Sequence, residues 1–388
     1  EGHRTFDFIL RDNFSYQIGK HTIKTGILLD HANISDANFY SDLTPAASET
    51  LSTFESGTVS SMTEAYPLAA SVPLSLFIMD PYVQDDWKLT PGLIINMGVR
   101  VEHFANPVCK TNCNAHFAGN FASLPSSSTT PYNQLIASGQ RNAFPGFQAF
   151  EVEPRIGFAW TPFNSNKKLV VRGSYGLYAD EYSAYIAESF LSNLPNAPSF
   201  TATSGLLAPG VAGSAVSSLN ASDSAFAAGF ASGGTYTTIS AAVKAQGGSF
   251  SLPTVSNPAF TNYPVYNEYN FGIQQELGKN TILDVRYVGT NGKDGLLRNA
   301  SANAYDPLNS SGNPTVNFTG LPTTQPNPNF GEVIQYTQEN VSNYNGLVTT
   351  VAHRSQYITA QINYNYSHAL DDVSNGGRFS DNRSSSIG

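Results

Sequence analysis

Cys109 and Cys113 have the clearest potential for covalent chemistry, and they are the only cysteines in the chain. Three residues separate them, and His116 alone does not complete a set of metal ligands around the pair. We therefore predict a small local disulfide formed in an oxidising compartment. Two free thiols on a loop are the alternative.

Catalytic and metal-binding motifs are otherwise missing from the sequence. It contains no nucleophile elbow, Walker loop, HExxH zinc motif or Rossmann fingerprint. Asp371 and Asp372, with Asn375 and Asp381, could attract Ca²⁺, but the spacing of an EF-hand loop is missing, and a solvated acidic tail is the alternative. We therefore predict no catalytic residue, no resident metal and no cofactor, and we expect that the protein is not an enzyme.

The composition excludes several classes of partner and fold. Of the 388 residues only 13% are charged, 12% are aromatic, and the net charge is −9. A chain this acidic offers no basic stripe for phosphates, so we expect no nucleic-acid partner. The sequence contains no run of about 18 apolar residues, so it predicts no transmembrane helix. The chain begins at Glu1 without a signal peptide, so we expect a processed chain or a fragment.

Charged side chains recur inside stretches that alternate between apolar and polar residues. Residues 82–103 are two such stretches joined by Thr90-Pro91-Gly92, a sequence suited to a tight turn. Alternation with a period of two predicts strands with one apolar and one polar face. We predict that the charged members of the polar faces line a water-filled interior: Arg100, Glu102, Arg172, Asp284 and Arg286.

The same hairpin unit occurs five times, and four long connections separate the repeats. The predicted hairpins span about residues 5–31, 82–103, 154–178, 266–289 and 344–367. The long connections span about 32–76, 104–153, 179–264 and 291–343. The connection 179–264 is rich in Ala, Ser and Gly, and we expect it to pack on a scaffold rather than to build a core of its own.

This arrangement predicts an all-β fold, an antiparallel transmembrane β-barrel of which about ten strands are present. Short turns must lie at one end of the sheet and long loops at the other, as in outer-membrane barrels. Aromatic side chains on the apolar faces predict two girdles at the headgroup levels of the membrane. The predicted girdle residues are Trp87, Trp160, Tyr175, Tyr287, Tyr364 and Tyr366.

The hairpins resemble the barrel of TonB-dependent outer-membrane receptors of the Oar-like group, which carry a carboxypeptidase-regulatory-like N-terminal domain. The resemblance covers all five hairpins but none of the long loops. One matching stretch is YVQDDWKLTPGLIINMGVRVEHFANP at residues 82–107, and its residues 82–87 with the proline that follows are the most specific motif. Further matching stretches are EPRIGFAWTPF (153–163), VVRGSYGLYAD (170–180), YNFGIQQELGKNTILDVRYVGTNG (269–292), YNGLVTTVAHR with ITAQINYNYSHALDD (within 344–372) and GKHTIKTG (19–26).

The resemblance implies a barrel of about 22 strands that is closed by an N-terminal plug and energised by the inner-membrane TonB complex. No plug or TonB box is recognisable in this sequence, so we expect the central part of such a barrel. The implied partners are outer-membrane lipid, the TonB complex through the plug, and a siderophore, oligosaccharide or peptide ligand. The implied location is the outer membrane of a Gram-negative bacterium. A passive porin-like channel and a carbohydrate-binding β-sandwich are the alternatives.

Overall fold

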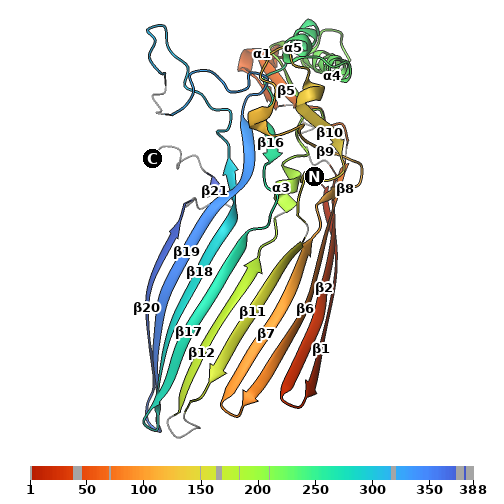
Figure 1. Cartoon of the computed structure of the whole chain (residues 1–388). Coiled ribbons are helices and arrows are strands. Elements are labelled where there is room, and N and C mark those ends of the chain that lie inside the picture. The colour runs from red at the N-terminus through yellow and green to blue at the C-terminus, as the bar shows by residue number, and fades with distance from the viewer. Residues whose placement is uncertain are drawn as a thin grey trace.

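Ten long strands form one antiparallel sheet in the computed structural model. The structure describes residues 2–37, 46–69, 71–148, 150–162, 168–182, 184–208, 210–315, 320–372 and 380–381. The ten strands follow one another across the sheet in chain order (Figure 1). They are β1 (Gly2–Ile18), β2 (His21–Ala37), β6 (Ser71–Thr90), β7 (Leu93–Phe104), β11 (Phe150–Trp160), β12 (Leu169–Ala179), β17 (Val265–Leu277), β18 (Thr281–Asn299), β19 (Val333–Arg354) and β20 (Thr359–Asp371).

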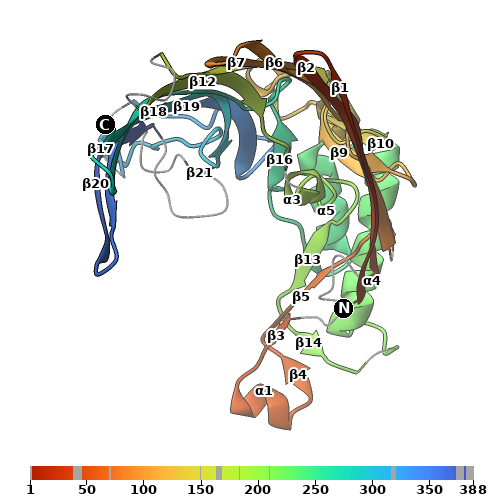
Figure 2. The same ribbon diagram turned by 90° about the horizontal axis from the view of Figure 1, so that it is seen from below.

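The sheet is strongly curved. Seen along the strands, it forms an arc, and helix α3 (Ala184–Glu188) and the connections around it lie on the inner side of that arc (Figure 2). We call the inner surface the concave face and the opposite surface the outer face. Every pair of neighbouring long strands is antiparallel, so the predicted all-β, antiparallel sheet is confirmed.

Short turns join the strands at one end of the sheet. Gly19 and Gly278 occupy turn positions with φ of 56° and 72°, a backbone conformation that glycine adopts without strain. Pro91-Gly92 forms the turn between β6 and β7. The predicted turn at residues 164–166, between β11 and β12, lies outside the described residues.

The outer face carries large side chains that are exposed to the surroundings. Cross-strand partners project from the same side of a sheet, so the register identifies this face as the apolar side of every predicted hairpin. Tyr269 lies across the neighbouring Gly289, where a Cβ atom would come within 2.3 Å of the ring. Exposed members of the outer face include Phe8, Leu10, Phe14, Val83, Met97, Val152, Ile156, Phe158, Phe271 and Ile273.

Several strands extend further toward the long connections than the sequence pattern predicts. β6 already begins at Ser71, and β19 begins at Val333. These extensions lie within or beside the predicted connections 32–76 and 291–343. Pairing with a neighbouring strand, as in the match of Ala37 with Ser71, extends the ladder where the alternation of side chains has ended.

The long connections fold together at the opposite end of the sheet from the short turns (Figure 1). We call this region the cap: residues 46–69, 105–148, 184–208, 210–264, 300–315 and 320–332. Short strands within it pair into small sheets that are separate from the sheet of long strands. The elements of the cap and its borders are β3 (Ala46–Ser48), α1 (Leu51–Glu55), β4 (Thr58–Val59), β5 (Ser61–Ala65), β8 (Val108–Cys109), β9 (Asn114–Phe117), η1 (Phe121–Ser123), α2 (Tyr132–Leu135), β10 (Ile136–Gln140), β13 (Ser199–Ala202), β14 (Gly205–Leu206), α4 (Ala215–Ala231), α5 (Tyr236–Ala245), β15 (Gly248–Ser249), β16 (Val255–Pro258) and, beside β18, β21 (Ser380–Asp381).

Helices α4 and α5 begin at residues that satisfy their free backbone N–H groups. The Ser214 hydroxyl accepts a hydrogen bond from Ser217 N, and Thr235 and Thr238 form a reciprocal capping box. Gly233, with φ of 78°, separates the two helices. Among the described residues, no helix combines the length and the apolar composition that a membrane span requires.

The cap has a hydrophobic core to which all four long connections contribute. Connection 179–264 supplies about half of its buried residues, including Phe200 and Phe226. Met62, Phe117 and Phe330 come from the other three connections. Connection 179–264 packs on the other long connections, as a segment without a core of its own would, but it also supplies about half of the shared core. The expectation that it lacks a core of its own is therefore correct only in part.

Asn303 connects two turns of the last long connection from inside the cap. Its side chain is 3% exposed, and the two N–H groups of Nδ2 are shared among three backbone carbonyls, those of Asn327, Phe330 and Gly331, at 2.9–3.0 Å. Its Oδ1 accepts a hydrogen bond from Asn327 N at 2.8 Å. This one side chain therefore contacts four backbone groups of the cap, three carbonyls and one N–H.

Replacing Asn303 with alanine should lower the free energy of unfolding of the cap by about 1–3 kcal/mol, because buried polar groups lose their partners. Hydrogen exchange of cap amides in the purified protein measures this change. Asn309→Ala, in an exposed turn of the same connection, is the matched control and should have little effect. Equal protection of the cap in both variants would show that Asn303 does not hold these turns together.

Candidate functional site

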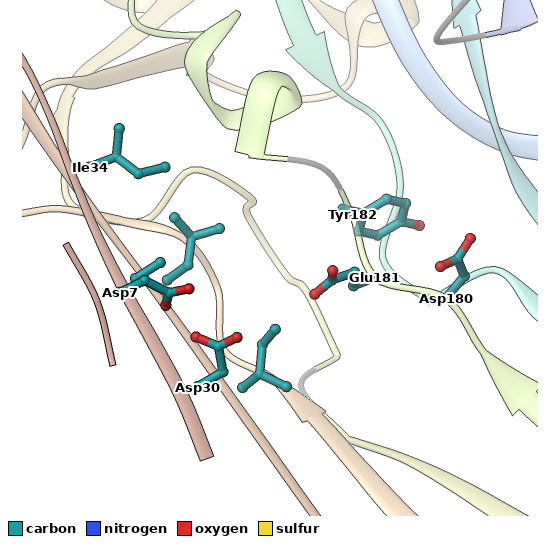
Figure 3. A pocket seen from close by; sticks show the side chains of 9 residues that line it. Asp7, Asp30, Ile34, Asp180, Glu181 and Tyr182 are labelled. Atoms are coloured by element: carbon teal, nitrogen blue, oxygen red, sulfur yellow. The ribbon is translucent and has the colours of Figure 1, made fainter. Parts of the chain in front are cut away.

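An acidic pocket lies on the concave face near the cap. It has a volume of about 450 Å³ and lies between strands β1, β2 and β6 and the segment that follows β12. Four carboxyl groups line it, from Asp7 and Asp30 on the strands and from Asp180 and Glu181 opposite them (Figure 3). The remaining lining residues are Tyr182 and the aliphatic side chains of Ala32, Ile34, Leu76 and Ile78.

The surroundings of Glu181 favour its neutral form. Glu181 lies beyond the end of β12, where removal from water raises the pKa of its carboxyl group. The charges of Asp180, Asp30 and Asp80 raise this pKa further. Cationic or hydrogen-bond-donating groups should therefore be favoured in this part of the concave face, and further anions disfavoured.

The raised pKa of Glu181 predicts a pH-dependent contribution to stability. A carboxyl group that binds its proton more tightly in the folded chain stabilises that state below its ordinary pKa of 4.5, and the contribution is lost as pH rises through the folded-state value. Glu181→Gln should reduce the loss of thermal stability between pH 4 and pH 7. The effect should be small because the side chain remains partly exposed.

Thermal unfolding of the purified protein at several pH values measures this effect. Glu49→Gln, at an exposed cap position, is the control and should retain the pH dependence of the unchanged protein. A Glu181→Gln variant with the unchanged profile would contradict the assignment.

Two further charged pairs lie on the concave face. Glu153 is fully buried; it pairs with Arg155 at 2.5 Å and accepts a hydrogen bond from the backbone N–H of Ala179. The guanidinium carbon of Arg155 lies 4.1 Å from the centre of the Tyr178 ring. These contacts fix the point at which the chain leaves β12 for the cap.

Arg100 and Glu102 form the second pair, with 3.3 Å between Nη1 and Oε1. Glu102 Oε2 and Asp80 Oδ1 are buried and have no hydrogen-bond partner among the described residues. Carboxylates therefore outnumber guanidinium groups on this part of the concave face.

The register places all five predicted interior residues on one face. Arg100 lies opposite Glu153, and Glu102 lies opposite Glu151. The same face continues across the sheet through the pairs Ala159–Arg172, Arg172–Gly272, Gly272–Arg286 and Gln274–Asp284. In the other direction it continues through Arg100–Tyr82 and Tyr82–Gly26 to the strand that carries Asp30. Asp30 lines the acidic pocket, so this is the concave face.

The two cysteines lie beside the long strands at the base of the cap. A disulfide joins Cys109 and Cys113, whose Cα atoms are 5.6 Å apart. Cys109 is buried against Val72, Leu74 and Leu191. The bond closes a small loop where β8 pairs with β6.

The predicted girdle residues lie on the outer face. Trp160 is 46% exposed, and Tyr364 and Tyr366 are also exposed. The Tyr175 and Tyr287 hydroxyl groups donate hydrogen bonds to Asn267 and Asn345, at 2.6 and 2.5 Å. Their positions relative to a bilayer remain predictions.

The structure also reveals contacts that the sequence pattern does not predict. Asp85 interrupts the apolar face of β6, and its carboxylate lies 2.7 Å from His21 Nδ1. The His21 ring stacks on Trp87 with 5.5 Å between ring centres. At the cap end of the outer face, four rings contact one another in sequence: His31, Phe77, His103 and Phe150. Only the register could reveal these sets, because their members lie on different strands.

The described residues contain no group of three or more His, Cys, Asp or Glu side chains arranged to hold a metal ion. Asp372 Oδ1 accepts a hydrogen bond from Val341 N at 3.0 Å and so caps the end of a strand pair. The side chains of Asn375 and Asp381, the other members of the acidic tail, are not among those described.

Comparison with known proteins identifies one matching family. Its description is "Outer membrane beta barrel domain", and it matches residues 1–387. A search of curated proteins gives no significant match.

The solved structures that match this chain are of low identity to it. The outer membrane transporter YddB from Escherichia coli is 11% identical, with a TM-score of 0.47 over 95% of this chain and 34% of that one. The FrpB iron transporter from Neisseria meningitidis is 10% identical, with a TM-score of 0.45 over 95% of this chain and 37% of that one. The siderophore receptor PirA from Pseudomonas aeruginosa is 11% identical, with a TM-score of 0.37 over 95% and 51%. The chain thus spans about a third of the first two of these proteins.

Proposed function

This chain belongs to the outer membrane beta barrel domain family, and from that premise we propose that it forms part of the wall of a receptor that imports a bulky ligand. The family confirms the predicted location in the outer membrane of a Gram-negative bacterium and the predicted transmembrane barrel. The proposal concerns what the barrel transports and how transport is energised.

The separation of short turns and long connections carries the proposal. In outer-membrane barrels the short turns face the periplasm and the long loops face the outside. By this rule the cap is extracellular and makes first contact with the ligand. The loops share a buried core, which supports a preformed binding surface rather than four independent loops.

The two faces of the sheet support a wall whose outer face contacts membrane lipid and whose concave face borders a transport route. All ten long strands have at least 11 residues, and a membrane-spanning strand needs about 9–11. The exposed apolar outer face suits lipid, while the concave face carries charges and pockets suited to water and solutes.

The resemblance of the hairpins supports an Oar-like TonB-dependent receptor. We infer that the ten strands are the central part of a barrel of about 22 strands, in which β1 and β20 pair with further strands. A plug domain encoded upstream would connect the barrel to the TonB complex. The ligand class remains open among siderophores, oligosaccharides and peptides, and the proposal includes no catalytic role.

Electrical conductance of the full-length protein in a planar lipid bilayer tests this proposal. A plugged receptor should be nearly closed, and it should bind the purified periplasmic domain of TonB in a pull-down assay. A steady open channel without TonB binding would instead support the passive porin, which the polar concave face also allows. Recovery of the protein in the soluble fraction without detergent would contradict both and favour a sugar-binding domain.

A further inference from the structure

Two arginines flank a glycine in one row of the concave face. Arg172 on β12 lies directly opposite Gly272 on β17, and Gly272 lies opposite Arg286 on β18. Neighbouring strands are about 4.8 Å apart, so the two arginine backbones are separated by about 10 Å with no side chain between them. A pocket of about 270 Å³ includes this row.

The charge of Arg172 is not neutralised by a neighbour. In the described part of the chain this side chain has no hydrogen bond or ion pair, and it is exposed on the concave face. Arg286 has only a distant contact with a carboxylate, 3.5 Å from Asp284 Oδ1 along its own strand, and it is 49% exposed. Arg155 differs from both because its guanidinium group forms an ion pair with Glu153 and lies over the ring of Tyr178.

Neutral polar groups surround the row. Asn270 and Gln274 lie on the same face of β17 as Gly272, at the nearest positions of that face before and after it along the strand. Both line the 270 Å³ pocket. Asn270 Nδ2 donates a hydrogen bond to Ser174 Oγ. A second pocket, of about 340 Å³, shares Arg172 and Asn270 with the first. The row therefore offers positive charge beside room for a larger polar molecule.

We propose that Arg172, Gly272 and Arg286 form an oxyanion subsite for a carboxylate or phosphate group of a soluble ligand. A guanidinium group donates two parallel hydrogen bonds to such a group, and two guanidinium groups can do so from opposite sides. Gly272 matters because any side chain there would fill the gap; a Cβ atom would lie only 3.3 Å from Arg286 Cγ. The inference rests on the proposed function, since the concave face must be open to solutes.

The acidic pocket near the cap and the arginine row together favour movement of an anionic group in one direction along the concave face. An anionic group is repelled by the carboxylates of Asp7, Asp30 and Asp180 and attracted by the arginine row closer to the short turns. Asp284 lies opposite Gln274, next to the row on the same face. Its negative charge reduces the local positive charge and so limits the strength of binding. A transport route requires such moderate affinity for release.

Calorimetric titration of the full-length protein in detergent with inorganic phosphate, and separately with citrate, tests the subsite. Arg172→Gln and Arg286→Gln should each weaken binding about 10-fold or more, because each removes a charge-assisted pair of hydrogen bonds. Gly272→Val should weaken binding similarly while retaining both charges. Arg11→Gln, on the same face of β1 but away from the row, is the control and should bind like the unchanged protein.

The two titrants distinguish a preference for phosphate from one for carboxylate. Unchanged affinity in the Arg172→Gln and Arg286→Gln variants would overturn the proposal, as would an equal loss in Arg11→Gln. If the unchanged protein binds neither titrant and both arginine variants lower its stability, the row is occupied by a carboxylate of the protein itself, and the proposal also fails. Binding in detergent does not require TonB, so this outcome is independent of the conductance and pull-down results.

Discussion

Replacing Phe330 with alanine should lower the free energy of unfolding of the cap by about 3–5 kcal/mol. Phe330 is fully buried, and its ring centre lies 5.0 Å from that of Phe117 and 6.1 Å from that of Tyr132. These contacts join the second and fourth long connections. The substitution removes apolar contacts and leaves a cavity in the hydrophobic core that the loops share.

Hydrogen exchange and limited proteolysis of the purified protein measure the change. Phe54→Ala is the matched control because Phe54 is 70% exposed on α1, and its loss should have little effect. The cap should lose protection in Phe330→Ala while the long strands keep theirs. Simultaneous loss of protection in the strands would show that cap and sheet unfold as one unit, and unchanged protection in the cap would contradict the shared core.

Val99→Arg should lower the free energy of unfolding in lipid by about 2–4 kcal/mol if Val99 lies near the bilayer midplane. Val99 is on the outer face of β7, opposite Val83 on one side and Pro154 on the other. A guanidinium group at this position must leave water for hydrocarbon or displace the chain toward the interface.

Val170→Arg provides the matched control, because Val170 lines a pocket on the concave face. Denaturant titration of both variants in lipid vesicles compares the same chemical change on the two faces. Val170→Arg should be much less destabilising than Val99→Arg. The opposite order would mean that the concave face, rather than the outer face, contacts lipid.

The long strands were predictable because their side chains alternate with a period that local sequence reveals. In β7 the alternation of Val99 and Val101 with Arg100 and Glu102 is enough to assign both faces. The ends of β6 and β19 were not predictable, since they depend on pairing with neighbouring strands rather than on alternation.

The functional surfaces were less predictable than the strands. Arg172 and Arg286 were identifiable as polar-face residues, but their placement on either side of Gly272 follows only from the register of three strands. The acidic pocket unites Asp30 with Glu181, about 150 residues away in the chain. The cap core depends on contacts among four connections whose separate sequences contain no pattern of a shared core.

Labelling of single cysteines in intact cells is the most direct test of the proposed transport wall and its orientation. Lys279→Cys places a thiol in the short turn between β17 and β18, and Ser232→Cys places one on the exposed end of α4 in the cap. The native cysteines are joined in a disulfide and should not react. A membrane-impermeant maleimide should label Ser232→Cys in intact cells, and Lys279→Cys only after the outer membrane is permeabilised. Labelling of Lys279→Cys in intact cells, with Ser232→Cys protected, would contradict the account.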